Sequence, residues 1–276
     1  MSAPKHMYSE IPPTKIRNRE EKFREAKNVP FWHFAGNIIF SSMLKSRFYS
    51  MMYKGLENFE ARDKNFATIF YAPHCNWWDG MVGYVIIHFL LRKLGKFRMR
   101  LMIEEMNRFP LFQYVGCFPI NKKSAQSAMK SLSYATNTLK DPDIAFWLFP
   151  QGIIRPPHYR PEIFQSGLAY MAQNAAKKFG GINLIPTAVN YTFLRQDRPE
   201  ILLEFGKPKI ITDPVFDRKE FTHKLEREFE EFMDKQQADI SKGNFEGYEY
   251  LYKEKLHWWR YIESKLKSIG INNKET

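Results

Sequence analysis

The chain has 276 residues and a formal net charge of +12, and 44% of its residues are hydrophobic. Aromatic residues alone make up 16% of the chain. A chain of this length and composition can bury a full core, which excludes an intrinsically disordered protein. The excess of Lys and Arg favours contact with an anionic partner, either nucleic acid, an acidic protein or an anionic bilayer, and does not choose among them.

The two cysteines, Cys75 and Cys117, are spaced neither as metal ligands nor as a disulfide framework. This predicts reduced thiols in a reducing compartment. Residues 1–27 are polar and lack the apolar core of a secretory signal. No apolar run reaches the ~18 residues that a transmembrane helix needs. We therefore expect a soluble protein or one that binds a membrane peripherally.

The N-terminal part of the chain divides into two segments of different composition. Residues 1–30 carry several prolines among mixed charges, which predicts a flexible lead. From residue 31 the chain turns apolar and aromatic, and this predicts a pair of amphipathic, membrane-associating helices within residues 31–60. Their apolar face either covers the core or enters the headgroup region of a bilayer, where Lys45, Arg47 and Lys54 meet anionic lipid.

Strand and helix patterns then alternate along the chain. The predicted strands are residues 66–71, 98–103, 117–120, 144–149, 183–191 and 200–205, and the predicted helices are residues 77–94, 110–114, 124–139 and 163–179. This alternation predicts an α/β domain over residues 61–212, a layered domain whose largely parallel central sheet is flanked by helices. Residues 213–276 are predicted to form C-terminal helices packed on the same domain. Within them, Trp258 and Trp259 beside basic residues either pack in the core or form a second interfacial element.

A His and an Asp follow the first predicted strand. Pro73 ends that strand, His74 comes next, and Asp79 lies five residues further on. In open α/β sheets the carboxyl ends of the strands are where ligands bind. A carboxylate at this distance can fix the tautomer of an imidazole and leave the other nitrogen free to act as a base. A buried histidine satisfied by a neighbouring carboxylate would give the same spacing.

Polar and basic residues also follow two later strands. Asn121 and Lys122 come directly after the predicted strand 117–120, and a Pro-Gln-Gly turn follows the strand 144–149. In a parallel sheet these carboxyl ends share one edge. The residues that we expect to line one crevice at that edge are His74, Asp79, Asn121, Lys122, Gln151, Gly152 and Arg155.

The order of these blocks resembles the glycerolipid (lysophospholipid) acyltransferase superfamily, and within it the 1-acylglycerol-3-phosphate acyltransferases. His74-Cys-Asn-Trp-Trp-Asp79 resembles the catalytic H-x-x-x-x-D motif, and residues 116–122 resemble the second block, a Gly, apolar residues and a basic residue. Phe149-Pro-Gln-Gly152 resembles the third block, F-P-E-G-T-R, and Ile185-Pro-Thr-Ala188 the fourth, an apolar residue before Pro. The likeness runs from about residue 66 to residue 208.

The resemblance implies an enzyme that moves a fatty acyl group from acyl-CoA or acyl carrier protein to a lysolipid hydroxyl, as in phospholipid biosynthesis. His74 would be the general base, oriented by Asp79. Asn121, Lys122, Gln151, Gly152 and Arg155 would bind the substrate. The resemblance implies no metal and no cofactor apart from the acyl donor as co-substrate. It also implies peripheral attachment to the cytoplasmic face of a membrane, with the bilayer surface as a partner.

The chain departs from the family pattern in the acceptor-binding blocks. Gln151 replaces the usual Glu, Ile153 replaces Thr, and the Arg is displaced by one residue to Arg155. Lys122 stands where Arg is usual, which gives up bidentate phosphate recognition. The acceptor is therefore open between lysophosphatidic acid and another lipid or glycolipid hydroxyl. A catalytically inactive membrane-binding protein is the remaining alternative.

Other classes of function lack their motifs in this chain. There is no G-x-S-x-G nucleophile elbow, and no H-E-x-x-H or C-x-x-C zinc motif. Cys75 adjoins His74, but neighbouring side chains usually point apart, which disfavours a Cys–His dyad. Basic residues gather between Arg92 and Arg108 without a nucleic-acid-binding motif, so we expect no nucleic-acid partner.

Overall fold

The computed structural model of the protein describes residues 22–104, 106–122, 124–194, 196–254 and 265. In this part of the chain nine strands form one mixed sheet in the order β4–β3–β5–β2–β6–β7–β1–β9, with β8 paired to β6. The strands are β1 (Ser50–Lys54), β2 (Thr68–Tyr71), β3 (Arg98–Ile103), β4 (Cys117–Pro119), β5 (Ile144–Leu148), β6 (Ile182–Thr192), β7 (Glu200–Phe205), β8 (Lys209–Ile211) and β9 (Glu249–Lys253). The predicted α/β fold with its largely parallel central sheet is confirmed.

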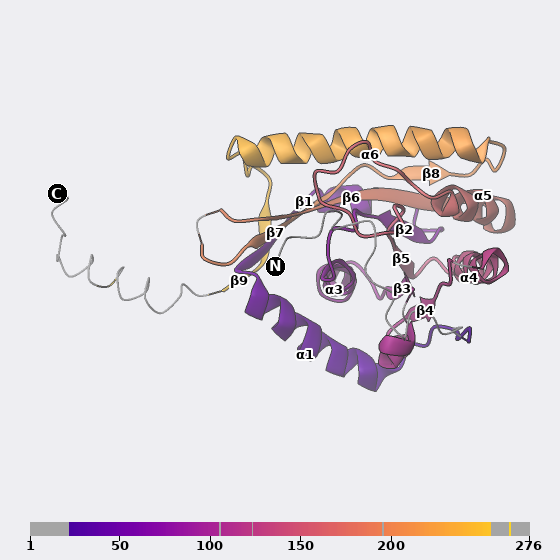
Figure 1. Cartoon of the computed structure of the whole chain (residues 1–276), viewed down its shortest axis with the longest axis horizontal. Coiled ribbons are helices and arrows are strands. Elements are labelled where there is room, and N and C mark those ends of the chain that lie inside the picture. The colour runs from indigo at the N-terminus through magenta and orange to yellow at the C-terminus, as the bar shows by residue number, and fades with distance from the viewer. Residues whose placement is uncertain (1–21, 105, 123, 195, 255–264, 266–276) are drawn as a thin grey trace, which may run out of the picture.

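Helices cover both faces of this sheet, and Figure 1 shows α6 on one side and α1 on the other. The α-helices are α1 (Pro30–Arg47), α2 (Leu56–Glu60), α3 (Asp79–Val85), α4 (Ala125–Thr138), α5 (Gly167–Phe179) and α6 (Arg218–Ser241). Helix α3 continues through a π-helical turn, Ile86–Leu90, and a 3-10 turn, Leu91–Lys93. Two further 3-10 helices, Met106–Arg108 and Pro110–Tyr114, connect β3 to β4.

The central strands are buried on both faces, which explains why their sequences are apolar throughout rather than alternating. Along β2, Ile69 and Tyr71 pack in a core with α4, α5 and α6, whereas Phe70 packs in a second core with α1 and α3. Strands β4, β3, β5, β2 and β6 run parallel to one another, whereas β7 and β8 pair with β6 in the antiparallel direction. Their carboxyl ends therefore meet at one edge of the sheet, as the sequence predicted.

The turn into β4 requires glycine. Gly116 has a φ of +101°, and a Cβ atom added there would lie 2.2 Å from the carbonyl oxygen of Met99 on β3. Only a residue without a side chain allows the two strands to approach this closely in that conformation. The turn starts the strand that delivers Asn121 and Lys122 to the shared edge.

The predicted pair of helices in the N-terminal segment is wrong, because a strand follows the first helix. Helix α1 is a single helix that runs unbroken past Gly36 and ends at Arg47, and residues 50–54 then form β1. Met51 and Met52 lie in the core, between the parallel neighbour β7 and the antiparallel neighbour β9. A short apolar run that is buried throughout has no periodicity to separate strand from helix, so the pattern misled the prediction.

The described residues before α1 form backbone hydrogen bonds, which a flexible lead would not form. The N–H groups of Lys27 and Val29 donate to the carbonyl oxygens of Gln113 and Tyr114, at 2.8 and 3.0 Å. The described part of this lead, from residue 22, is thus bonded to the connection between β3 and β4. The prediction for residues 1–21 lies outside the described residues.

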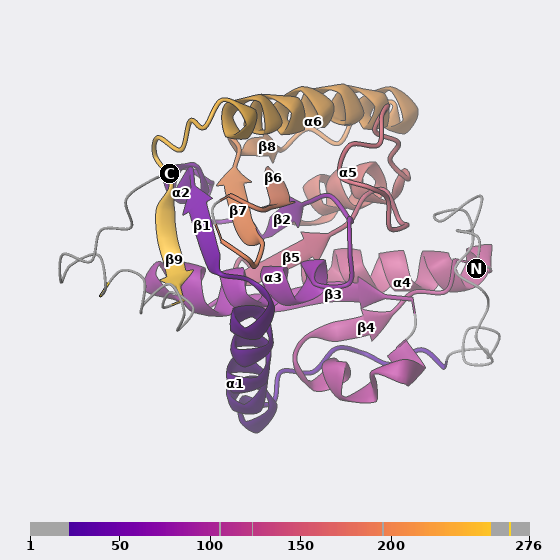
Figure 2. The ribbon, with the colours of Figure 1, turned by 60° about the vertical axis from the view of Figure 1, so that its left-hand side comes forward.

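Residues 213–276 were predicted to be helical. Helix α6 agrees with that prediction, but residues 249–253 form the strand β9, so the prediction is wrong there. Strand β9 pairs with β1 at the edge of the sheet (Figure 2). The prediction for Trp258 and Trp259 lies outside the described residues. Among the helices that the structure describes, none combines the length and apolar character needed to cross a bilayer.

Helix α5 begins later than the predicted residue 163 because the preceding segment has other partners. The N–H of Glu162 donates to Glu230 of α6, and the N–H of Phe164 donates to Glu226 of α6, both at 2.7 Å. These backbone donors are therefore satisfied by α6 rather than by a first helical turn.

Candidate active site

His74, in the loop between β2 and α3, forms a hydrogen-bonded pair with Asp79, the first residue of α3. The distance from His74 Nδ1 to Asp79 Oδ2 is 2.9 Å. The same carboxylate oxygen accepts the backbone N–H groups of Cys75 at 2.7 Å and Asn76 at 2.9 Å. Asp79 is only 2% exposed. The loop therefore wraps around a buried carboxylate and directs the imidazole at it.

Tyr191 is a member of the site that the sequence did not indicate. It lies near the end of β6, and its hydroxyl donates to Asp79 Oδ1 at 2.5 Å. Burial raises the pKa of Tyr191 well above its usual range, and the charge of Asp79 adds to the rise. The phenol is therefore a neutral donor that satisfies the second oxygen of Asp79. No spacing along the chain connects two residues so far apart, so sequence motifs could not reveal this contact.

Three contacts hold His74, one through its ring and two through its backbone. Its ring stacks on Phe149, with centroids 4.3 Å apart and planes inclined by 12°. Its backbone N–H donates to Gln151 Oε1 at 2.7 Å, and its carbonyl oxygen accepts the N–H of Arg155 at 2.8 Å. No residue in the described part of the chain forms a hydrogen bond with His74 Nε2. The nitrogen opposite Asp79 is therefore available to a substrate.

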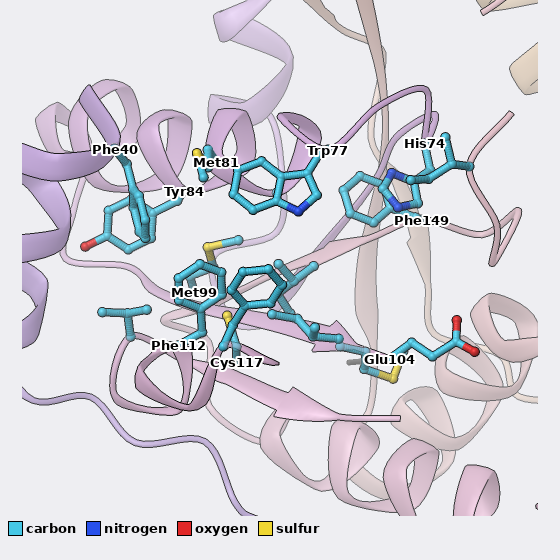
Figure 3. Close-up of a pocket in the computed structure, with 17 residues that line it drawn as sticks. Phe40, His74, Trp77, Met81, Tyr84, Met99, Glu104, Phe112, Cys117 and Phe149 are labelled. Carbon is cyan, nitrogen blue, oxygen red and sulfur yellow. The ribbon is translucent and has the colours of Figure 1, made fainter. Parts of the chain in front are cut away.

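An apolar cavity extends from His74 between α3 and the sheet. In Figure 3 its labelled lining residues run from His74 and Phe149 at one end, past Trp77 and Met81, to Phe40 and Tyr84 at the other. Helix α1 contributes to its wall, because Phe40 belongs to that helix. Of the described residues, Glu104 is the only Asp, Glu, Lys or Arg that lines this cavity. The cavity suits a hydrocarbon chain whose reactive end lies beside His74.

A second pocket also contains His74 and is lined in addition by Lys122 and Gly152. Lys122 Nζ donates to the carbonyl oxygen of Gly152 and pairs with Glu104 at 2.7 Å. Glu104 directly follows β3 and lines both pockets. The sequence prediction did not include this residue, although its place just after a strand could have suggested it. His74 therefore stands between an apolar cavity and a pocket that contains an ion pair.

The other predicted site residues occupy different positions around His74. Gln151 is 3% exposed and lies beneath the loop, where its Nε2 donates to Glu162 Oε2 at 2.7 Å. The guanidinium of Arg155 lies over the ring of Tyr159, 4.3 Å from its centroid. Asn121 follows β4, and neither Asn121 nor Arg155 is among the residues that line the two pockets. The structure thus brings His74, Asp79, Lys122 and Gly152 together, and places the others around them.

Cys75 adjoins His74 but is not arranged as a nucleophile. Its thiol is largely buried, and burial together with the charges of Asp79 and Glu162 raises its pKa. Neither Cys75 nor Cys117 forms a disulfide. Among the residues that the structure describes, no three His, Cys, Asp or Glu side chains gather as ligands for a metal ion.

Comparison with known proteins identifies related sequences and structures. A family model described as Acyltransferase matches residues 51–190, about half of the chain. Among solved structures, the 1-acyl-sn-glycerophosphate (LPA) acyltransferase PlsC from Thermotoga maritima is similar, with a TM-score of 0.46 and 14% sequence identity. The likeness covers 75% of this chain and 79% of that chain. Among curated proteins, none matches the sequence.

We predict that Tyr191→Phe destabilises the protein. The substitution leaves Asp79 Oδ1 buried without its donor, which costs about 1–3 kcal/mol. Urea denaturation followed by circular dichroism measures the loss in the free energy of unfolding. Tyr250→Phe is the matched control, because Tyr250 is 51% exposed. Equal stability of the two variants would contradict the role that we give to the Tyr191 hydroxyl.

Proposed function

The chain belongs to the acyltransferase family, and on that premise we propose that it moves a fatty acyl group from acyl-CoA or acyl carrier protein to a lysolipid hydroxyl at a membrane surface. The observation that carries the proposal is the position of His74. Its Nδ1 is bonded to a buried carboxylate, and its ring lines both the apolar cavity and the pocket with Lys122. A base at this junction can meet a hydroxyl while the acyl chain lies in the cavity.

The proposed reaction is direct transfer between two bound substrates. The acceptor hydroxyl gives its proton to His74 Nε2 as its oxygen attacks the thioester carbonyl, and Asp79 stabilises the imidazolium that forms. When the tetrahedral intermediate collapses, the C–S bond breaks and the imidazolium returns the proton to the leaving thiolate. The products are an oxygen ester and a free thiol, and no acyl group is bound to the enzyme.

Lys122 is the group that we propose for stabilising the oxyanion of that intermediate. The N–H of Gly152 already donates to the carbonyl oxygen of Phe149 at 3.1 Å, so that turn has no spare donor at Gly152. Lys122 Nζ lies against the carbonyl oxygen of Gly152 in the pocket that His74 also lines. A cation held in such a pocket stabilises developing negative charge more than it would in water.

The chemical class of the acceptor depends on which group Lys122 binds. If Lys122, Arg155 and Asn121 bind an anionic headgroup, the acceptor is a lysolipid of the lysophosphatidic acid type. The ion pair between Lys122 and Glu104 favours a second candidate, an uncharged lipid or glycolipid hydroxyl, because Glu104 already balances the charge of Lys122 before any acceptor binds. Lys122 still has a donor for the oxyanion, since its ammonium group has three N–H groups and its contacts with Glu104 and Gly152 use two. An anionic acceptor would have to displace Glu104, whose side chain is 51% exposed and therefore able to turn away.

Helix α1 is the element that we propose for attachment to the cytoplasmic face of a membrane. Phe31, Phe34 and Ile38 recur at helical spacing and are 67%, 66% and 57% exposed, so they form an apolar stripe on the solvent side. Lys45 and Arg47 lie in the last turn of the same helix. An apolar stripe beside cations is typical of a helix that lies in the interface of an anionic bilayer. Lys54 has a different role, since it pairs with Glu204.

We predict that His74→Ala and Asp79→Asn each lower the rate of acyl transfer by about 10²–10⁴-fold, the usual contribution of a general base and its orientation. The measurement uses labelled acyl-CoA and acyl carrier protein with lysolipids, glycolipids and lipid alcohols as acceptors. His223→Ala is the matched control, because His223 forms a His–carboxylate pair with Glu226 on the exposed side of α6.

Three outcomes of that experiment have different consequences. Transfer to lysophosphatidic acid that depends on His74 supports the anionic acceptor. Transfer only to uncharged hydroxyls supports the second candidate and the neutralising role of Glu104. An absence of transfer in the wild-type protein with every donor and acceptor would contradict the proposed enzyme and favour a membrane-binding protein.

We predict that Gly80→Leu shortens the acyl chains that the protein accepts. Gly80 lines the apolar cavity, and the nearest atom to an added Cβ would be a methyl group of Leu101 at 3.4 Å. A leucine side chain would extend into the cavity, and each methylene that it displaces costs about fourfold in kcat/KM. Competition among acyl-CoA chain lengths measures the shift.

Gly167→Leu is the control for the cavity variant. Gly167 also lies at the start of a helix, and its added Cβ would meet a methyl group of Leu132 at the same 3.4 Å, away from both pockets. We expect this variant to keep the wild-type preference. An unchanged preference in Gly80→Leu would show that the chain lies elsewhere.

We predict that Phe31→Ser, Phe34→Ser and Ile38→Ser together weaken binding to anionic vesicles. Each exposed apolar side chain that no longer enters the bilayer forfeits about 1.5–3 kcal/mol at most. Sedimentation with phosphatidylglycerol-containing vesicles measures the partition coefficient. Phe193→Ser combined with Val215→Ser is the control, since these side chains are 66% and 83% exposed outside α1. Equal partitioning of both variants and the wild type would contradict the proposal that α1 contacts the membrane.

A further inference from the structure

A line of buried polar side chains runs from the backbone of His74 away from the two pockets. The N–H of His74 donates to Gln151 Oε1, and Gln151 Nε2 donates to Glu162 Oε2, both at 2.7 Å. Gln151 is 3% exposed and Glu162 is 5% exposed, and neither lines either of the two pockets beside His74. We propose that Glu162 is a positioning residue for acyl transfer, which acts through Gln151 to hold the backbone of His74. This inference rests on the proposed function, in which His74 is the base.

The carboxylate of Glu162 determines the orientation of the Gln151 amide. An amide has a carbonyl oxygen that only accepts and an NH₂ group that only donates, whereas an ionised carboxylate only accepts. The NH₂ group must therefore face Glu162, and this leaves the carbonyl oxygen for the N–H of His74. Without the carboxylate, the buried NH₂ group has no acceptor, which is costly, and the amide loses the contact that orients it.

Glu162 is itself held by helix α6 and by a neighbouring cation. Its backbone N–H donates to Glu230 Oε2 at 2.7 Å, and its Oε1 accepts from Arg160 Nη1 at 3.3 Å. Arg160 in turn pairs with Asp234 of α6. Burial raises the pKa of Glu162, while the hydrogen bond from the amide and the charge of Arg160 oppose that rise. The contacts therefore join His74 to a helix that contributes no residue to either pocket wall.

The pair also explains why the chain has Gln151 in a motif that otherwise resembles F-P-E-G. A carboxylate at position 151 would face the carboxylate of Glu162, and two carboxylates in contact cannot both stay ionised. Exchanging the two side chains would restore complementarity. A carboxylate at position 151 can accept both the N–H of His74 and an NH₂ group at position 162. The two positions therefore allow a reciprocal test.

The test compares Gln151→Glu, Glu162→Ala and the exchanged variant Gln151→Glu/Glu162→Gln in steady-state acyl transfer. We expect each single variant to lower kcat at least about tenfold with KM nearly unchanged, because the base and not the substrate is displaced. The exchanged variant should recover to within about threefold of the wild type. Glu246→Ala, at an exposed position of the chain, is the control.

Two further measurements separate positioning from folding and from the reaction itself. Urea denaturation gives the folded fraction, so that kcat is expressed per folded enzyme. Amide hydrogen exchange reports the N–H of His74 directly, and Glu162→Ala should accelerate that exchange at least about tenfold. Unchanged exchange, wild-type kcat in both single variants, or an exchanged variant no better than Gln151→Glu alone would overturn the proposal. Accelerated exchange in a protein without any transfer would support the contact while contradicting the proposed function.

Discussion

A carboxylate as deeply buried as that of Asp79 is tolerated only where hydrogen-bond donors surround it. Asp79 has four such donors, namely His74 Nδ1, the N–H groups of Cys75 and Asn76, and the hydroxyl of Tyr191. Three of them come from one short loop, which has to curl around the carboxylate to supply them. The contacts that satisfy the buried charge therefore also give the imidazole one orientation, with its other nitrogen facing the pockets.

The topology of the sheet supplies the surroundings of that pair. Because β2, β3, β4 and β5 are parallel, the loops that follow them converge on one edge, and His74 contacts a loop that lies about 80 residues further along the chain. The apolar cavity lies along α3, whereas Lys122 lines only the second pocket and Glu104 lines both. The proposed reaction requires this division, because the acyl chain of the donor and the polar groups of the acceptor must meet at the thioester carbonyl.

Local patterns in the sequence predicted the parts of the structure that local chemistry determines. Pro73 and the apolar strand before it placed His74 at a strand end, and the helix predicted from residue 124 is α4, for which Ser124 is the N-cap. The site contacts that no pattern predicted are long-range ones. Tyr191 reaches Asp79 from another strand, and Glu162 reaches Gln151 across a loop without regular spacing. Residues 50–53 were predicted to be helical because burial of the whole segment removes the periodicity that identifies a strand.

The central claim is that Asp79 fixes His74 with Nδ1 as the donor and leaves Nε2 as the base. Long-range ¹H–¹⁵N correlation spectra of imidazole-labelled protein, with His74 assigned by comparison with His74→Ala, measure the tautomer directly. The account predicts that the neutral form of His74 has its proton on Nδ1 and not on Nε2 in the wild-type protein, and that Asp79→Asn loses this preference. A His74 that carries its proton on Nε2 in the wild-type protein would contradict it.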